Sequence, residues 1–131
     1  MQREEFEKLV AEEFPTAVPE EFRPKISNVA FLIEDEPSQE LRREENLGPH
    51  TTLLGHYRGI PHTARGDHYG LGATMPDTIT LFQLPIEDEA RELGVDVRQV
   101  IRDTIWHEVF HHFGADESAV RRRERELRKR P

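Results

Sequence analysis

Residues 107–114 read HEVFHHFG, in which His107 and His111 are four positions apart and a glutamate directly follows the first. This stretch ends a longer segment, 96–113, whose apolar residues recur at helical spacing, so we predict a helix capped by Asp96. Positions four apart share one face of a helix, with Cβ atoms roughly 5–6 Å apart. His107 and His111 can therefore bind one metal ion together.

Glu108 lies one helical step from His107, which in this motif places its carboxylate beside the metal rather than on it. A zinc ion with three protein ligands keeps one position for water and lowers the pKa of that water to about 7. We therefore predict that Glu108 is the general base, which takes a proton from the water and returns it to the leaving group. Apolar neighbours of the motif also predict that the side chains of His107, Glu108 and His111 are partly buried.

A third ligand is expected shortly after the helix, because Gly114 allows the chain to turn back toward the metal. Glu117 lies six residues after His111, which is the offset at which metzincins place a third histidine. Asp116 competes for the same role. It can instead cap a final helical segment, and Glu117 can instead complement that helix terminus. The spacing favours Glu117, and Asp116 stays open as the alternative.

The rest of the chain predicts a small sheet and further helices. The expected strands are 28–33, 51–59 and 78–84; the expected helices are an N-terminal one closed off by Pro15 and Pro19, a short one over 87–93 and a C-terminal one over 116–130. The polar segment 40–49 is expected to be a loop, and 60–76 is rich in Gly, Pro and His. This pattern indicates the α+β class.

Composition narrows the possibilities further. The chain has 131 residues, 35% hydrophobic and 34% charged, so we interpret 1–131 as a single folded domain. It contains no cysteine, so a metal must be held by His, Asp or Glu. The formal net charge of -8 argues against a general nucleic-acid binder. No apolar run approaches membrane length and the N-terminus is acidic, which predicts a cytoplasmic protein without a membrane partner.

Six motifs occur along the chain in a specific order. They are FEKLV at 6–10, NV at 28–29, EDEP at 34–37, LGHYRGIP at 54–61, PDTITL at 76–81 and HEVFHHFG at 107–114. This set resembles the bacterial minimal zincin-like metallopeptidases over almost the whole chain. The resemblance implies a compact minimal zincin-like domain of the α+β class. In such a domain a small sheet packs on the HExxH active-site helix, flanked by N- and C-terminal helices, and an acidic or polar residue is the third ligand.

Three further side chains are candidates for supporting roles. Tyr57 and His68 lie in or beside the segment rich in Gly, Pro and His, and either one is a candidate to stabilise an oxyanion opposite the metal. His112 points about 100° away from its neighbouring ligand on the helix, so we interpret it as a histidine of the core or of the layer behind the ligands.

Two functions follow from these residues. The first is a zinc-dependent metallopeptidase-like hydrolase with one zinc per chain, acting on a peptide or protein substrate that pairs with an edge strand at 78–84. The alternative is a non-catalytic metal-binding or protein-interaction module that retains the fold. Glu108 favours the hydrolase, because a structural site gains nothing from an unliganded carboxylate. A domain of this size has little surface from which to form a substrate cleft, so a second copy of the chain in a homodimer, or a partner protein, is the candidate to complete the cleft.

Overall fold

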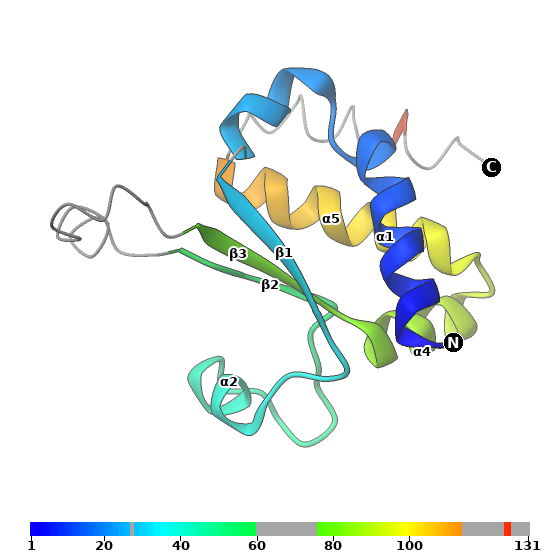
Figure 1. Ribbon diagram of the computed structural model, residues 1–131. Helices are drawn as coiled ribbons and strands as arrows, with labels where there is room; N and C mark the ends of the chain where they lie inside the picture. The colour runs from blue at the N-terminus through cyan, green and yellow to red at the C-terminus, as the bar shows by residue number, and fades with distance from the viewer. Residues whose placement is uncertain (27, 60–75, 114–124, 127–131) are drawn as a thin grey trace, which may run out of the picture.

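The computed structural model describes residues 1–26, 28–59, 76–113 and 125–126. In these residues four α-helices and a three-stranded sheet form an α+β fold, which confirms the predicted class (Figure 1). The helices are α1 (Arg3–Ala17), α2 (Gln39–Glu44), α4 (Gln83–Leu93) and α5 (Val97–Phe113), with a short 3-10 helix over Glu20–Ile26; the strands are β1 (Val29–Glu34), β2 (Gly55–Arg58) and β3 (Asp77–Phe82). The predicted C-terminal helix lies almost entirely outside the described residues.

The central strand of the sheet is β3. It pairs in parallel with β1 and antiparallel with β2, so Ile79 lies between Phe31 and Tyr57. The prediction that a peptide pairs with an edge strand at 78–84 is therefore wrong, because both hydrogen-bonding edges of β3 already have neighbours. The edge strands of this sheet are β1 and β2, and β2 is the edge strand that packs against α5.

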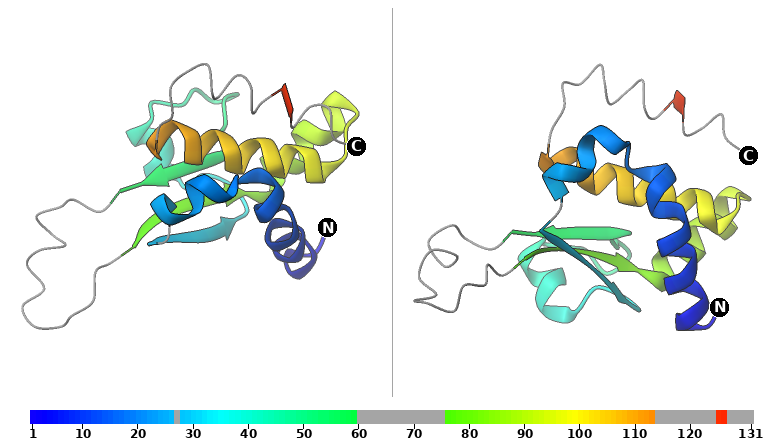
Figure 2. Two further views of the ribbon diagram at one scale, coloured as in Figure 1. Left: turned by 90° about the horizontal axis from the view of Figure 1, so that it is seen from above. Right: turned by 45° about the horizontal axis from the view of Figure 1, so that its top comes forward.

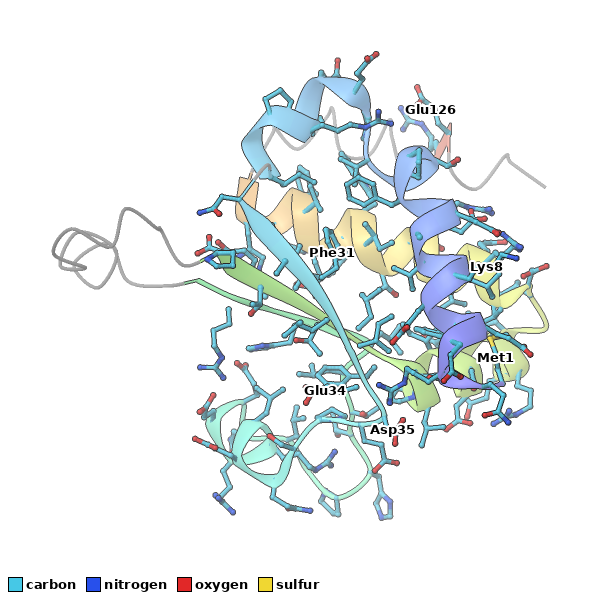
Figure 3. All side chains as sticks on the ribbon, in the orientation of Figure 1. Met1, Lys8, Phe31, Glu34, Asp35 and Glu126 are labelled. Carbon is cyan, nitrogen blue, oxygen red and sulfur yellow. The ribbon has the colours of Figure 1, made fainter. Side chains whose placement is uncertain are left out.

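The helices α1 and α5 lie on the same side of the sheet (Figure 2). Phe31 of β1 contributes to the layer of side chains between sheet and helices, where its ring meets that of Phe14 edge-on at a centroid distance of 5.3 Å (Figure 3). The fully buried residues of this core include Phe6, Ile79, Leu81, Ile101, Ile105, Trp106 and Val109. Burial contributes about 1.5–3 kcal/mol for each large apolar side chain, so the apolar face of α5 holds this helix against the sheet.

The ends of α4 and α5 agree with the sequence signals. The helix α4 ends at Gly94, which has a left-handed φ of 67° that a glycine adopts without strain. The carboxylate of Asp96 accepts a hydrogen bond of 2.8 Å from the backbone N–H of Arg98, which confirms the predicted cap. The resulting α5 has 17 residues. None of the described helices is long and apolar enough to cross a membrane.

The predicted strand end at Pro85 is wrong, and the predicted end of the first helix holds for Pro19 but not for Pro15. The third strand stops at Phe82 and α4 begins at Gln83, so Pro85 lies in the first helical turn, where the missing N–H costs no helical hydrogen bond. The first helix continues through Pro15 to Ala17. The turn closes around this proline because the backbone N–H of Val18 donates to the carbonyl of Phe14 at 3.0 Å.

The segment 40–49 was expected to be a loop, and it contains most of α2. The hydroxyl of Ser38 accepts a hydrogen bond of 3.0 Å from the backbone N–H of Leu41, which caps the helix, and the Leu41 side chain is buried. One buried residue in a short polar helix gives no periodicity to detect. The second strand is also shorter than its prediction and spans only Gly55–Arg58.

A buried ion pair joins α1 to α5 and predicts a large loss of stability when it is broken. Glu13 accepts hydrogen bonds of 2.9 Å from Arg98 and from Arg102, and only 8% of the Arg102 side chain is exposed. We expect Glu13→Gln to lower the free energy of unfolding by about 3 kcal/mol, because it leaves the Arg102 charge buried without its counter-ion. Urea unfolding followed by circular dichroism measures this change.

The neighbouring Glu12 provides a matched control for that measurement. Among the described residues its only ion pair is with Arg98, at 2.9 Å, and its side chain is 40% exposed. Glu12→Gln removes the same charge from the same helix, and we expect it to leave the unfolding curve nearly unchanged. Equal losses in the two variants would show that net charge, rather than the buried pair, determines the effect.

Candidate metal centre

The two motif histidines lie next to each other on α5. The ring centroids of His107 and His111 are 4.2 Å apart with an interplanar angle of 69°, as expected for positions that share a helix face. Both side chains are exposed, so the predicted partial burial of the imidazoles is wrong. The apolar stripe of α5, which includes Trp106 and Val109, faces the core and leaves the histidines on the other side. Their ring nitrogens are accessible to an ion from solvent.

Glu108 differs from His107 and His111, because only 14% of its side chain is exposed. Burial raises the pKa of this carboxyl above its ordinary value, since the charged form loses contact with water. A general base works best when its pKa lies near the working pH, so this shift moves Glu108 toward the range that proton transfer near neutrality requires. The predicted partial burial is confirmed for this residue.

Gly55 explains how β2 comes so close to this part of α5. A Cβ atom added to Gly55 would lie 2.9 Å from Cγ2 of Thr104 and 3.3 Å from Cγ of Glu108. Only a glycine leaves this space, so the first residue of β2 forms one wall around the Glu108 side chain. Gly55 is not among the site residues predicted from the sequence. The available signal was an isolated glycine inside the predicted strand 51–59, directly after Leu54, because a glycine within a strand suggests a close backbone approach.

This close approach predicts that Gly55→Ala destabilises the fold. The added methyl group must displace Thr104, Glu108 or the strand itself, and overpacking of this kind costs about 1–3 kcal/mol. Thermal unfolding of the metal-free protein measures the change. Gly48→Ala is the matched control, because in the described part of the chain its Cβ would meet only the hydroxyl oxygen of Thr51, at 3.7 Å. A Gly55→Ala variant as stable as the Gly48→Ala variant would contradict the close approach.

His112 lies four residues after Glu108 on α5, and its ring stacks on that of Tyr57. The two rings have a centroid distance of 4.0 Å and an interplanar angle of 13°. Burial lowers the pKa of His112, and the neighbouring histidines His111, His56 and His107 lower it further. The imidazole is therefore neutral at neutral pH. Its Nε2 lies 3.7 Å from the Glu108 carboxylate, which is longer than a hydrogen bond, so this contact is weak.

Of the remaining predicted site residues, the structure describes only Tyr57. Tyr57 is on β2 beside the site, but its hydroxyl donates to the carboxylate of Asp77. A tyrosine has a single hydroxyl proton, so in this geometry that proton is directed at Asp77 and not at a substrate oxyanion. His68, Asp116 and Glu117 lie outside the described residues.

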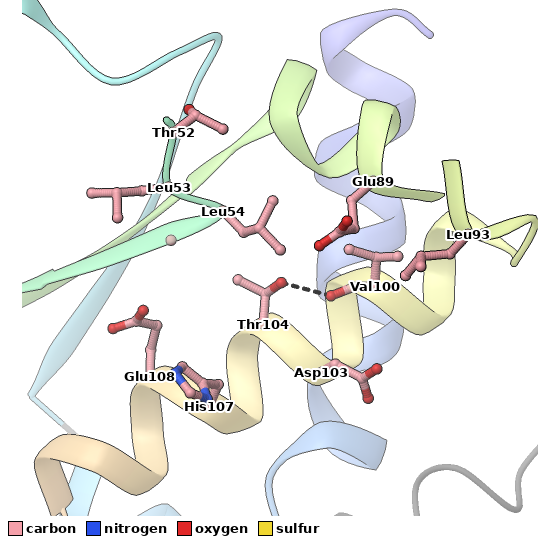
Figure 4. Close-up of a pocket in the computed structure, with 11 residues that line it drawn as sticks. Thr52, Leu53, Leu54, Glu89, Leu93, Val100, Asp103, Thr104, His107 and Glu108 are labelled. Carbon is pink, nitrogen blue, oxygen red and sulfur yellow. Dashed lines mark hydrogen bonds between the residues drawn. The ribbon is translucent and has the colours of Figure 1, made fainter. Parts of the chain in front are cut away.

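A pocket of about 380 Å³ opens beside Glu108 between β2, α4 and α5, and we call it the α4–α5 pocket (Figure 4). Its lining residues are Thr52, Leu53, Leu54, Gly55, Glu89, Leu93, Val100, Asp103, Thr104, His107 and Glu108. Thr104 satisfies its hydroxyl by donating to the carbonyl of Val100 at 2.7 Å. Since His107 and Glu108 both line this pocket, a molecule bound in it is adjacent to the proposed metal ligands.

The donor set of α5 suits zinc. Imidazole nitrogens are common zinc ligands, and His107 and His111 present two of them side by side. Among the described residues, no three side chains of His, Cys, Asp or Glu are close enough to hold a metal ion together. Both candidates for the third ligand, Asp116 and Glu117, are in the part of the chain that is not described.

Comparison with known proteins agrees with this geometry. A profile of the zincin-like metallopeptidase family matches residues 26–127, which is more than half of the chain. The chain belongs to the zincin-like metallopeptidase family. This membership confirms the resemblance seen in the motifs, and it implies zinc binding in general for this zincin-like metallopeptidase.

A solved structure, described as a conserved hypothetical protein from Thermo thermophilus, has a similar fold. It superposes on this zincin-like metallopeptidase with a TM-score of 0.54 at 24% sequence identity, covering 92% of this chain and 99% of that one. At this identity the likeness concerns the fold alone. No curated protein matches the chain.

Proposed function

We propose that this zincin-like metallopeptidase is an active zinc-dependent hydrolase of peptide or amide bonds. One observation carries the proposal: α5 holds two accessible imidazoles side by side, and the residue directly after the first of them is a largely buried carboxylate with a raised pKa. The imidazoles of His107 and His111 suit metal binding, and the Glu108 carboxylate suits proton transfer. Their separation into two environments matches the two tasks that hydrolysis needs.

Each residue has a distinct role in this proposal. His107 and His111 hold the zinc, with Glu117 as the third ligand. When bound, zinc supplies a Lewis acid that polarises the substrate carbonyl and makes water a better nucleophile at neutral pH. Glu108 accepts the proton from the attacking water on its carboxylate and donates it to the leaving amine. Gly55 lets β2 lie close against the Glu108 side chain.

The sheet supports binding of an extended substrate at β2. This four-residue strand is an edge strand, and it packs against α5 next to Glu108. An extended peptide that adds to a free strand edge obtains its affinity from backbone hydrogen bonds. We therefore propose a peptide or protein substrate at the edge of β2. A second copy of the chain or a partner protein completing the cleft remains a prediction.

Metal removal tests the proposed function. We expect purified protein to contain about one zinc per chain and to cleave members of a random peptide library, because three ligands with one open position define a catalytic zinc site. Treatment with a chelator should abolish cleavage, and added zinc should restore it. Elemental analysis measures the zinc content, and mass spectrometry of the digest measures peptide cleavage. One bound zinc without any cleavage would instead support the non-catalytic metal-binding or protein-interaction module.

A further inference from the structure

The α4–α5 pocket has features that bear on which substrates fit the site. We propose that it is a specificity pocket for a cationic side chain, lysine or arginine, next to the scissile bond of the substrate. This inference rests on the proposed function, because it assigns a substrate class to the same site. It follows from the shape of the pocket, from the side chains along it and from the distribution of charge between its two ends.

The middle of the pocket is apolar. Leu54 of the segment leading into β2 and Val100 of α5 line it, and Leu93 at the end of α4 lines it although 64% of its surface is exposed. A substrate side chain that covered Leu93 would remove exposed apolar surface from water. The site therefore favours a substrate residue with a long hydrocarbon stem over a short polar one.

The end of the pocket away from the motif carries a carboxylate. Figure 4 shows Glu89 on α4 opposite Glu108 on α5, with its carboxylate pointing toward Leu54 and Thr104. Among the described residues, Glu89 has neither a hydrogen bond nor an ion pair. A second carboxylate, that of Asp103, also lines the pocket, and none of the described lining residues is a lysine or arginine. A partly buried negative charge without a counter-ion is stabilised by a ligand that brings one.

The opposite end of the pocket is the proposed zinc site at His107, where a positive metal would repel a cationic group. A bound cation is therefore favoured only at the Glu89 end, with an apolar stem across the middle. Lysine and arginine have this form, since they lay their methylene groups along apolar surface and keep the charge at the tip. A substrate aspartate or glutamate would instead place its charge against Glu89 and Asp103.

Binding, measured apart from catalysis, tests the inference. The probes are two alanine-based peptides that carry either arginine or its neutral isostere citrulline at the central position. Binding to the zinc-loaded Glu108→Gln protein is measured by calorimetry, so that neither peptide is cleaved. We expect the arginine peptide to bind about tenfold more tightly, because only arginine brings a positive charge that can form an ion pair with Glu89.

Two further variants separate the effect of the pocket on binding from the effect of the overall charge. Glu89→Gln, added to Glu108→Gln, should bring the arginine-to-citrulline ratio close to one. Glu92→Gln removes the same charge from the same helix, but Glu92 is exposed and does not line the pocket, so this variant should keep the ratio. Equal affinity for the two peptides, including no measurable binding of either, overturns the inference. An equal loss of the ratio in the Glu89 and Glu92 variants overturns it too.

Cleavage by the zinc-loaded parent protein gives a second readout. In a random peptide library we expect lysine and arginine to be enriched at one position beside the cleaved bond, and Glu89→Gln to remove this enrichment. Cleavage without any preference for lysine or arginine contradicts the inference but leaves the proposed function intact. No cleavage of any peptide contradicts the proposed function, and the binding ratio still decides whether the pocket selects a cation.

Discussion

Glu108→Gln is expected to keep the fold and the bound zinc while lowering hydrolysis by at least about 100-fold, the lower end of what general acid–base catalysis contributes. The amide has nearly the shape of the carboxylate, so it fits the space between Gly55, Thr104 and the turns of α5. It cannot accept a proton from water. Initial rates on the best-cleaved library peptide, together with elemental analysis of both proteins, measure the effect.

The control for this variant is Glu92→Gln, which removes one negative charge from an exposed position of α4. It should cleave at the parent rate, because Glu92 lies outside the machinery of the site. A Glu108→Gln protein that retains zinc and cleaves as fast as the parent would show that another group transfers the proton. Loss of zinc from Glu108→Gln would instead place this carboxylate among the ligands.

The same substitution has a predicted effect on the stability of the metal-free protein. Burial raises the pKa of Glu108 in the folded state above its unfolded value, so ionisation of this group favours the unfolded state. The penalty is absent below the ordinary glutamate pKa, grows as the pH rises toward the raised pKa, and is constant above it. Glutamine does not ionise. The metal-free variant should therefore melt above the parent at neutral pH, and the difference should vanish in acid.

The sequence predicts a feature of the fold only when the residues that determine this feature are close together in the chain. The helix α5 was predicted within one residue, because its apolar spacing, the cap at Asp96 and the histidine pair are all local to 96–113. The place of β3 in the sheet was not predictable in this way. Strand order depends on pairing between distant segments, and an apolar strand of six residues has the same pattern at an edge or in the centre.

The walls of the site were missed for the same reason. Gly55 and Glu89 come from β2 and α4, and neither is near the motif in the sequence. Gly55 matters through a distance of 2.9 Å to a side chain of α5, and Glu89 matters through the pocket that it faces. Sequence spacing shows which residues on one helix can act together, whereas the side chains that surround them are set by packing between elements.

The zinc ligands give the second large expected effect. Glu117→Ala should weaken zinc binding by at least about 100-fold, more than the loss of a group that only orients a ligand. The double variant His107→Ala, His111→Ala sets the reference for a destroyed site and should retain no zinc. A competition titration with a chromophoric chelator measures the zinc affinity of the parent protein and of both variants. Full zinc retention by the double variant would remove the basis of the whole assignment.

The comparison with Asp116→Ala decides between the two carboxylates. Glu117 is favoured because it lies six residues after His111, with Gly114 between them, and its longer side chain tolerates more displacement of the turn. Asp116 has a structural role available as the cap of the next helical segment, so Asp116→Ala should cost about 1 kcal/mol of stability and leave zinc bound. The reverse pattern would assign the ligand to Asp116. Unchanged zinc affinity in both single variants would place the third ligand elsewhere, with His68 as the next residue to replace.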